Sequence, residues 1–176
     1  MGLDSCALRY FTKITDVTIQ NGGLMETINQ YAFANCPNLL TVQIPNSVRT
    51  IRKFAFQGSP QVILIFTNGT NSITFNNLDS IKAILYYRTA QMQITYEFSW
   101  YTFPIYTYNS NLINLKTLDI RLLSEIEEVN ENTSYSQLVN IIFNKKSSKD
   151  NKTKTSYHKS KSPLNLLLIT EIIIKM

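Results

Sequence analysis

The clearest pattern of apolar and polar residues in the chain is the segment LLTVQIPNS. Three apolar residues follow the spacing LxxLxL there: Leu39, Val42 and Ile44. Thr41 and Gln43 lie between them, so the segment predicts a short β-strand that buries one face and turns the other outward. Pro45 has no N–H for a strand ladder and is expected to end the strand, while Asn46 begins a turn.

This pattern is repeated 23 residues further along the chain. The segment INQYAFANCPNLL returns as IRKFAFQGSPQVI, so that Phe33 matches Phe56 and Pro37 matches Pro60. A fixed period of this length predicts a solenoid, because one coil cannot cover its own apolar face and needs stacked neighbours. We expect the two phenylalanines to fill the side of the coil opposite the strand, each stabilising the fold by roughly 2 to 3 kcal/mol.

The repeat resembles the BspA-like leucine-rich repeat family, which is found on the surfaces of bacteria and protist parasites. The residues that carry the resemblance are Ala32, Phe33, Cys36, Leu39, Val42, Ile44 and Pro45. The resemblance covers residues 28–66 in two clear repeats. It implies a mainly β fold, a short leucine-rich repeat solenoid with 23-residue coils, and a role in adhesion or host-surface interaction.

Weaker copies of the strand spacing lie on both sides of these repeats. Residues 1–27 are interpreted as a worn first repeat, because the apolar spacing occurs there too: Ile14, Val17 and Ile19. Residues 67–144 are interpreted as diverged repeats or a β-rich extension. The spacing recurs there in three groups: Leu78, Ile81, Ile84 and Tyr86; Leu112, Leu115, Leu118 and Ile120; Leu138, Ile141 and Phe143. An apolar-rich chain also produces such spacings by chance, so both explanations stay open.

Residues 92–108 are crowded with aromatic and β-branched side chains, which favour strands. We expect a hairpin or a pair of coil strands in this segment. Its aromatic residues Trp100, Tyr101 and Phe103 are expected in the hydrophobic core, and an exposed aromatic contact surface is the alternative.

The formal charge of +5 is concentrated near the C-terminus. Residues 145–161 hold seven lysines and one aspartate, which leaves ten basic and eleven acidic side chains elsewhere. The nearly neutral body is not expected to bind nucleic acid. The composition of residues 145–162 predicts a disordered Lys/Ser-rich linker.

The apolar sequence of residues 163–176 predicts a strand or a short helix that docks on the solenoid. Association of residues 145–176 with a membrane of acidic lipids is the less favoured alternative.

Residues suited to catalysis or metal binding are few. His158 is the one histidine and lies in the lysine-rich segment, while Cys6 and Cys36 form neither a disulfide framework nor a zinc motif. Cys36 occupies the cysteine position of the repeat, where Ser59 stands in the next coil, and is expected to be a buried, inert thiol. We therefore expect no enzyme, no catalytic residues, no cofactor and no metal.

The sequence thus predicts a non-enzymatic module for protein-protein interaction. The resemblance implies adhesion or cell-surface recognition as its role, with another protein or an extracellular-matrix component as its partner. Stacked strands place outward side chains in adjoining rows. The repeat spacing then predicts one outward, partner-binding patch: Thr41, Gln43, Leu64, Phe66, Leu85 and Tyr87. A patch this apolar on a monomer indicates a partner.

Two alternatives stay open. Residues 1–8 contain no apolar signal segment behind a positive start, which favours an intracellular scaffold and a cytoplasmic location over the cell surface. The repeats also weaken toward the C-terminus, as in a truncated or decaying family member, whose open strand edge would promote aggregation.

Overall fold

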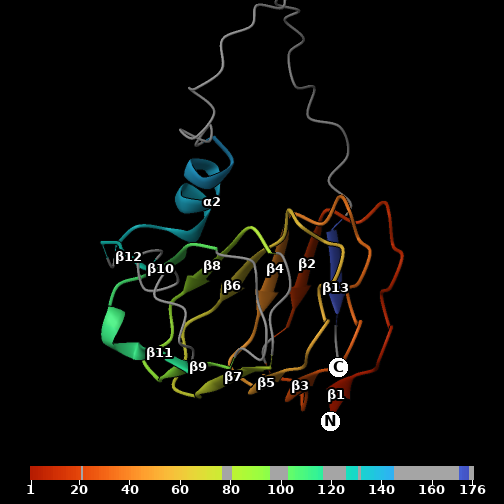
Figure 1. The fold of residues 1–176 in the computed structure, drawn as a ribbon, viewed down its shortest axis with the longest axis horizontal. Helices are drawn as coiled ribbons and strands as arrows, with labels where there is room; N and C mark the ends of the chain where they lie inside the picture. Colours follow the sequence, from red (N-terminus) through yellow and green to blue (C-terminus); the bar gives the residue numbers. More distant parts are fainter. Residues whose placement is uncertain are drawn as a thin grey trace, which may run out of the picture.

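The computed structural model describes residues 1–20, 22–76, 81–95, 103–116, 126–130, 132–144 and 171–174. Within these ranges the chain winds into a β-solenoid whose coils stack through parallel strands (Figure 1). The predicted fold, a mainly β solenoid, is confirmed. The predicted linker at residues 145–162 lies outside the described residues.

Two parallel sheets form two sides of the solenoid. Sheet I has seven strands in the order β12-β10-β8-β6-β4-β2-β13. These strands are β2 (Asp16–Ile19), β4 (Thr41–Ile44), β6 (Ile63–Phe66), β8 (Ala83–Tyr86), β10 (Ile105–Thr107), β12 (Ile126–Glu128) and β13 (Glu171–Ile174). Sheet II has six strands in the order β1-β3-β5-β7-β9-β11. These are β1 (Gly2–Leu3), β3 (Thr27–Ile28), β5 (Thr50–Ile51), β7 (Ile73–Asn76), β9 (Met92–Thr95) and β11 (Ile113–Lys116).

The third side of the early coils consists of tight turns that stack on one another. Among the described residues, the non-glycine residues with positive φ all lie in these turns: Cys6, Tyr10, Tyr31, Asn35 and Phe54. The left-handed conformation costs roughly 1 to 2 kcal/mol per residue, so the turns need support from their neighbours. Hydrogen bonds between coils give it: Phe33 N donates to Ala55 O at 2.8 Å, and Asn35 N donates to Gln57 O at 2.7 Å.

The core lies between the two sheets and the turns. One inward row of sheet I shows how it is built: Val17, Val42, Leu64, Ile84 and Ile105 stand beside one another on successive strands. All of them are buried. Phe33 and Phe56 fill the third side, as predicted, and are fully buried. Each coil therefore covers the apolar face of the next.

Cys36 and Ser59 occupy equivalent positions in consecutive coils. Cys36 is buried, as predicted. Its Sγ donates to Leu8 O at 3.1 Å, and the Ser59 hydroxyl donates to Phe33 O at 2.8 Å. The same hydroxyl accepts a hydrogen bond from Cys36 N at 2.9 Å. A small donor at this position satisfies a carbonyl of the preceding coil, which explains why serine can replace cysteine.

The prediction that Leu64 and Phe66 point outward is wrong. β4 and β6 pair with Val42 beside Leu64, and both Leu64 and Phe66 lie in the core. One residue separates Val62 from Leu64, whereas two separate Leu39 from Val42, so the second strand arrives one residue early. Because side chains alternate along a strand, a shift of one residue exchanges its two faces.

The later coils keep part of the predicted pattern. Ile81, Ile84 and Tyr86 are buried in the core, as their spacing predicts. The aromatic segment forms β9 and β10, which belong to different sheets and are coil strands rather than a hairpin. Phe103 is buried, and the 3-10 helix η1 (Ser110–Leu112) follows β10. Other residues of these predictions lie outside the described ranges: Leu78, Trp100, Tyr101, Leu118 and Ile120.

The last group of residues predicted to continue the strands is helical instead: Leu138, Ile141 and Phe143 lie in α2 (Tyr135–Asn144). Leu138 and Ile142 are four residues apart and share one buried face of the helix. Ser134 and Gln137 form a capping box at its start. Ser134 N donates to Gln137 Oε1 at 2.9 Å, and Gln137 N donates to Ser134 Oγ at 3.3 Å. These local signals favour a helix over a strand.

Residues 171–174 of the apolar C-terminal segment dock on the first coil, as the sequence predicts. β13 pairs in parallel with β2, with Ile172 beside Val17. It thereby covers an edge of β2 that would otherwise expose unpaired backbone groups. Within the described ranges, no helix has both the length and the apolar character needed to cross a membrane.

Candidate interaction surface

The face of sheet I that points away from the core, the outer face, changes from polar to apolar along the sheet. β4 contributes Thr41 and Gln43, which are half-buried. The Thr41 hydroxyl donates to a carboxylate oxygen of Asp16 on β2. The next two strands present an apolar strip: Ile63, Ile65, Ala83 and Leu85. An apolar strip of this kind is normally shielded from water by another part of the chain or by a partner.

Helix α2 covers this apolar strip from within the same chain. Leu138 and Ile142 are buried against it, together with Tyr106 of β10. Figure 1 shows α2 above β8 and β10, while β2 and β4 lie farther along the sheet. Burying two large aliphatic side chains stabilises this arrangement by roughly 3 to 6 kcal/mol. Of the apolar residues that the sequence assigned to a partner, Leu85 and Tyr87 are therefore in contact with the cluster that α2 covers.

The six residues predicted to bind a partner fall into three environments. Two are half-buried on the uncovered part of the outer face: Thr41 and Gln43. Two border α2, Leu85 buried beneath it and Tyr87 half-buried and packed against the same cluster. The remaining two lie in the core: Leu64 and Phe66. The structure thus does not bring the six together on one open surface.

Tyr87 joins the loop before α2 to the solenoid. Its hydroxyl donates to Thr133 O at 3.0 Å. Burial raises the pKa of this hydroxyl, which keeps it protonated and able to donate at neutral pH. The backbone oxygen of Tyr87 accepts a hydrogen bond from the Tyr108 hydroxyl at 3.0 Å. One residue therefore links two successive coils and the start of the helical region.

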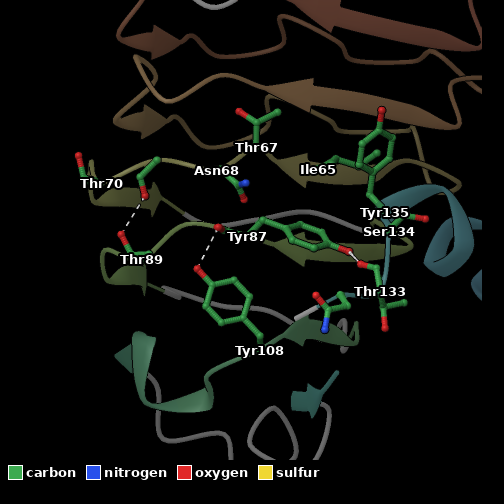
Figure 2. Close-up of a pocket in the computed structure, with 12 residues that line it drawn as sticks. Ile65, Thr67, Asn68, Thr70, Tyr87, Thr89, Tyr108, Thr133, Ser134 and Tyr135 are labelled. Carbon is green, nitrogen blue, oxygen red and sulfur yellow. Dashed lines mark hydrogen bonds between the residues drawn. The ribbon is translucent and has the colours of Figure 1, made fainter. Parts of the chain in front are cut away.

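A groove of about 860 Å³ lies between this loop and the coil turn at residues 67–70. In Figure 2 the ring of Tyr87 lies between those of Tyr108 and Tyr135. The described residues that line the groove are neutral: Ile65, Thr67, Asn68, Gly69, Thr70, Tyr87, Thr89, Tyr108, Asn132, Thr133, Ser134 and Tyr135. Its walls come from segments far apart in the sequence, so no local sequence motif predicts the groove.

Arg88 is a fully buried cation that ties two coil turns together. Its Nη1 donates to Val48 O at 2.9 Å and to Asn71 O at 3.1 Å, and its Nη2 donates to Pro45 O. Its guanidinium carbon lies 5.3 Å from the ring centroid of Phe66. Its Nε–H has no acceptor among the described residues. Burial lowers the pKa of Arg88 to about 10, so the side chain remains charged at neutral pH.

Two kinds of reactive group bear on catalysis, metal-ligating side chains and thiols. Across the described ranges, no three His, Cys, Asp or Glu side chains gather where they could hold a metal ion. Cys6 is exposed. Cys36 is enclosed in the core, where burial raises the pKa of its thiol and disfavours the reactive thiolate.

These features define a repeat solenoid whose successive coils add strands to two parallel sheets, with part of sheet I left accessible beside α2. The chain matches the family described as BspA type Leucine rich repeat region, in six copies over residues 3–99. The match spans more than half of the chain, and the protein belongs to this family, as the repeat predicted. No curated protein and no solved structure matches the chain. Membership of this family indicates a protein-interaction repeat module.

Proposed function

We propose that this protein is a non-enzymatic recognition module that binds another protein or an extracellular-matrix component at the cell surface, in adhesion. Its membership of the BspA-type leucine-rich repeat family supports a binding role. The adhesive role and the location come from the resemblance of its repeats to those of surface proteins.

The observation that carries the proposal is the division of the outer face by α2. The helix covers the apolar strip and leaves a polar strip on β2 and β4, which holds Asp16, Thr41 and Gln43. All three side chains keep accessible surface, and strands of a solenoid present such side chains in rows of fixed spacing. A rigid polar row costs little conformational entropy when a partner binds, which favours this strip as the contact surface.

Binding to immobilised extracellular-matrix proteins and to intact cells tests the contact surface. Gln43→Arg places a long cation in the centre of the strip, and we expect it to weaken binding by about tenfold or more. Gln57→Arg makes the same change at an exposed position on the turn side of the solenoid and should leave binding unchanged. Equal binding by both variants, with unchanged circular dichroism, would contradict this assignment of the surface.

The location requires a separate test. A membrane-impermeant reagent applied to intact native cells should label the protein if it acts at the surface. Protein that is labelled after lysis alone would contradict the adhesive role. The search for a partner of the same polar strip would then move to the cell interior.

A further inference from the structure

The groove beside Tyr87 has a lining chemistry that the proposed contact strip on β2 and β4 does not share. Three tyrosine rings line it, together with the amides of Asn68 and Asn132 and several threonine and serine hydroxyls. Among its described residues there is no charged side chain. Its volume of about 860 Å³ is within the range of small-molecule sites, roughly 300 to 1,000 Å³.

The groove is held in shape by hydrogen bonds between its own walls. The hydroxyls of Tyr87 and Tyr108 both donate to backbone oxygens, which fixes the two rings. On the opposite wall, Thr89 N donates to Gly69 O at 2.9 Å and Thr89 Oγ1 donates to the same oxygen at 3.2 Å. A ligand that enters therefore meets side chains that are already ordered, which lowers the cost of binding.

The lining excludes several classes of ligand. A charged ligand would lose its hydration without meeting an opposite charge among the described lining residues. A purely apolar ligand would leave buried amides and hydroxyls without partners, at a cost for each group. An extended peptide cannot add to the sheet here, because β6 and β8 are already paired on both sides.

A pyranose ring satisfies these requirements together. Its C–H face packs on an aromatic ring, and its hydroxyls both donate to and accept from amides and hydroxyls. We propose that this groove binds a neutral carbohydrate, with Tyr87, Tyr108 and Tyr135 as the stacking surfaces and Asn68 and Asn132 as hydrogen-bonding groups. The groove adjoins the strip on β2 and β4, because its lining residue Ile65 pairs with Gln43. It takes a ligand of different chemistry and so adds a second binding site to the molecule.

The sugar can come from two sources. Asn68 and Asn132 each begin an Asn-x-Ser/Thr sequence, so the sugar is either free or part of a glycan linked to the protein itself. Full-length protein made in bacteria carries no such glycan and therefore measures the free sugar. Protein from a eukaryotic secretory host, with its linked glycans located by mass spectrometry and titrated in the same way, measures the linked one.

The experiment titrates the bacterial protein with three neutral probes, triacetylchitotriose, maltotriose and cellotriose, by calorimetry and saturation-transfer NMR. We expect saturable binding of at least one probe, weakened about tenfold by Tyr135→Ala. Tyr135 is half-exposed at the first turn of α2, so its truncation leaves the core intact. Tyr10→Ala removes an exposed tyrosine from the third side and should leave the affinity unchanged.

Two results would overturn the proposal. One is that none of the probes binds the bacterial protein. The other is that binding occurs and Tyr135→Ala and Asn68→Ala leave it as strong as in the unaltered protein. If the glycosylated protein binds no probe while the bacterial protein does, the linked glycan is the natural occupant. If glycosylation does not change the affinity for the probe, a free carbohydrate is the natural occupant.

Discussion

Phe33 and Phe56 lie face to face in consecutive coils, with ring centroids 5.2 Å apart and planes within 1° of parallel. A second aromatic pair, Tyr31 and Phe54, repeats the arrangement nearer the surface, with centroids 5.6 Å apart. The two ladders occupy the turn side of the solenoid, where no sheet joins the coils. On this side, stacked rings and backbone hydrogen bonds therefore hold neighbouring coils together, as strand pairing does on the other two sides.

Truncation of the inner ladder should destabilise the protein far more than truncation of the outer one. We expect Phe56→Ala to lower the free energy of unfolding by about 3 to 5 kcal/mol, because it leaves a cavity in a fully buried position. Phe54→Ala removes a half-buried ring at a neighbouring position and should cost about 1 kcal/mol. Urea denaturation followed by circular dichroism measures both. Equal losses would show that the inner ladder carries no special share of the stability.

Arg88 should contribute to stability through its backbone acceptors. Arg88→Ala removes this donor from the carbonyls of Val48 and Asn71, and each buried group left unsatisfied costs about 1 to 3 kcal/mol. The Pro45 carbonyl keeps the hydrogen bond from Val48 N. We expect a loss of at least about 2 kcal/mol in the free energy of unfolding. Arg88→Lys should also destabilise, since one ammonium cannot reproduce the fork of the guanidinium.

The exposed Arg49 offers a matched control for Arg88. Arg49→Ala should change the free energy of unfolding by less than about 0.5 kcal/mol, as surface substitutions usually do. A loss for Arg88→Ala as small as that for Arg49→Ala would show that water replaces the guanidinium without cost.

Two neighbouring isoleucines test how α2 is attached to the outer face. Ile142 is 6% exposed and packs on the apolar strip, whereas Ile141 is 47% exposed. We expect Ile142→Ala to destabilise the helix and its docking by about 2 to 4 kcal/mol and to increase binding of a hydrophobic dye. Ile141→Ala should be close to neutral, because alanine is the better helix former. Dye binding and urea denaturation that fail to distinguish the two variants would contradict the covered face.

The two thiols should differ sharply in reactivity. A disulfide reagent should modify Cys6 at once, because that side chain is exposed, and Cys36 only when the coil opens. In a Cys6→Ser variant, the remaining thiol should react slowly in buffer and rapidly in urea. Rapid modification of this variant in buffer would contradict the enclosed position of Cys36.

Burial also gives the stability a dependence on pH through Cys36. Its pKa is raised in the folded state, so the unfolded chain loses this proton first as the pH rises. The stabilising contribution is therefore complete below the unfolded pKa of the thiol and is lost as the pH rises through the folded value. Cys36→Ser should lose less stability than the unaltered protein over this alkaline range. Thermal or urea unfolding at several pH values measures the difference.

Much of the fold could be predicted because the spacing of apolar and turn residues within the repeat indicates where each strand lies and where it ends. The alternation around Val42 and the position of Pro45 predict β4 (Thr41–Ile44) with the correct inward face and the correct end. The buried Phe33 and Cys36 also follow from their places in the repeat. These features depend on the periodicity of a strand and on the small size of each coil, which are local properties.

The six residues of the predicted contact surface do not form one surface, for two physical reasons. A strand has a period of two residues, so the early arrival of Leu64 moved both Leu64 and Phe66 from the outer face to the core. All four residues of β6 are buried, and its sequence ILIF has no polar residue to reveal which face is which. The second reason is α2, because the spacing of Leu138, Ile141 and Phe143 predicted a strand and gave no sign of a helix docked on the sheet.

The sequence by itself determined that the chain is a solenoid, which residues make its clear repeats, and that its body is nearly neutral. The spacing of buried residues and the preference of certain residues for turns act over a few positions, so both can be read directly from the sequence. The tertiary structure decided the register between coils, the cover that α2 places over the apolar strip, the three acceptors of Arg88 and the tyrosine-lined groove. These depend on residues brought together by stacking from distant parts of the chain, and their contact energies have no counterpart in the local sequence.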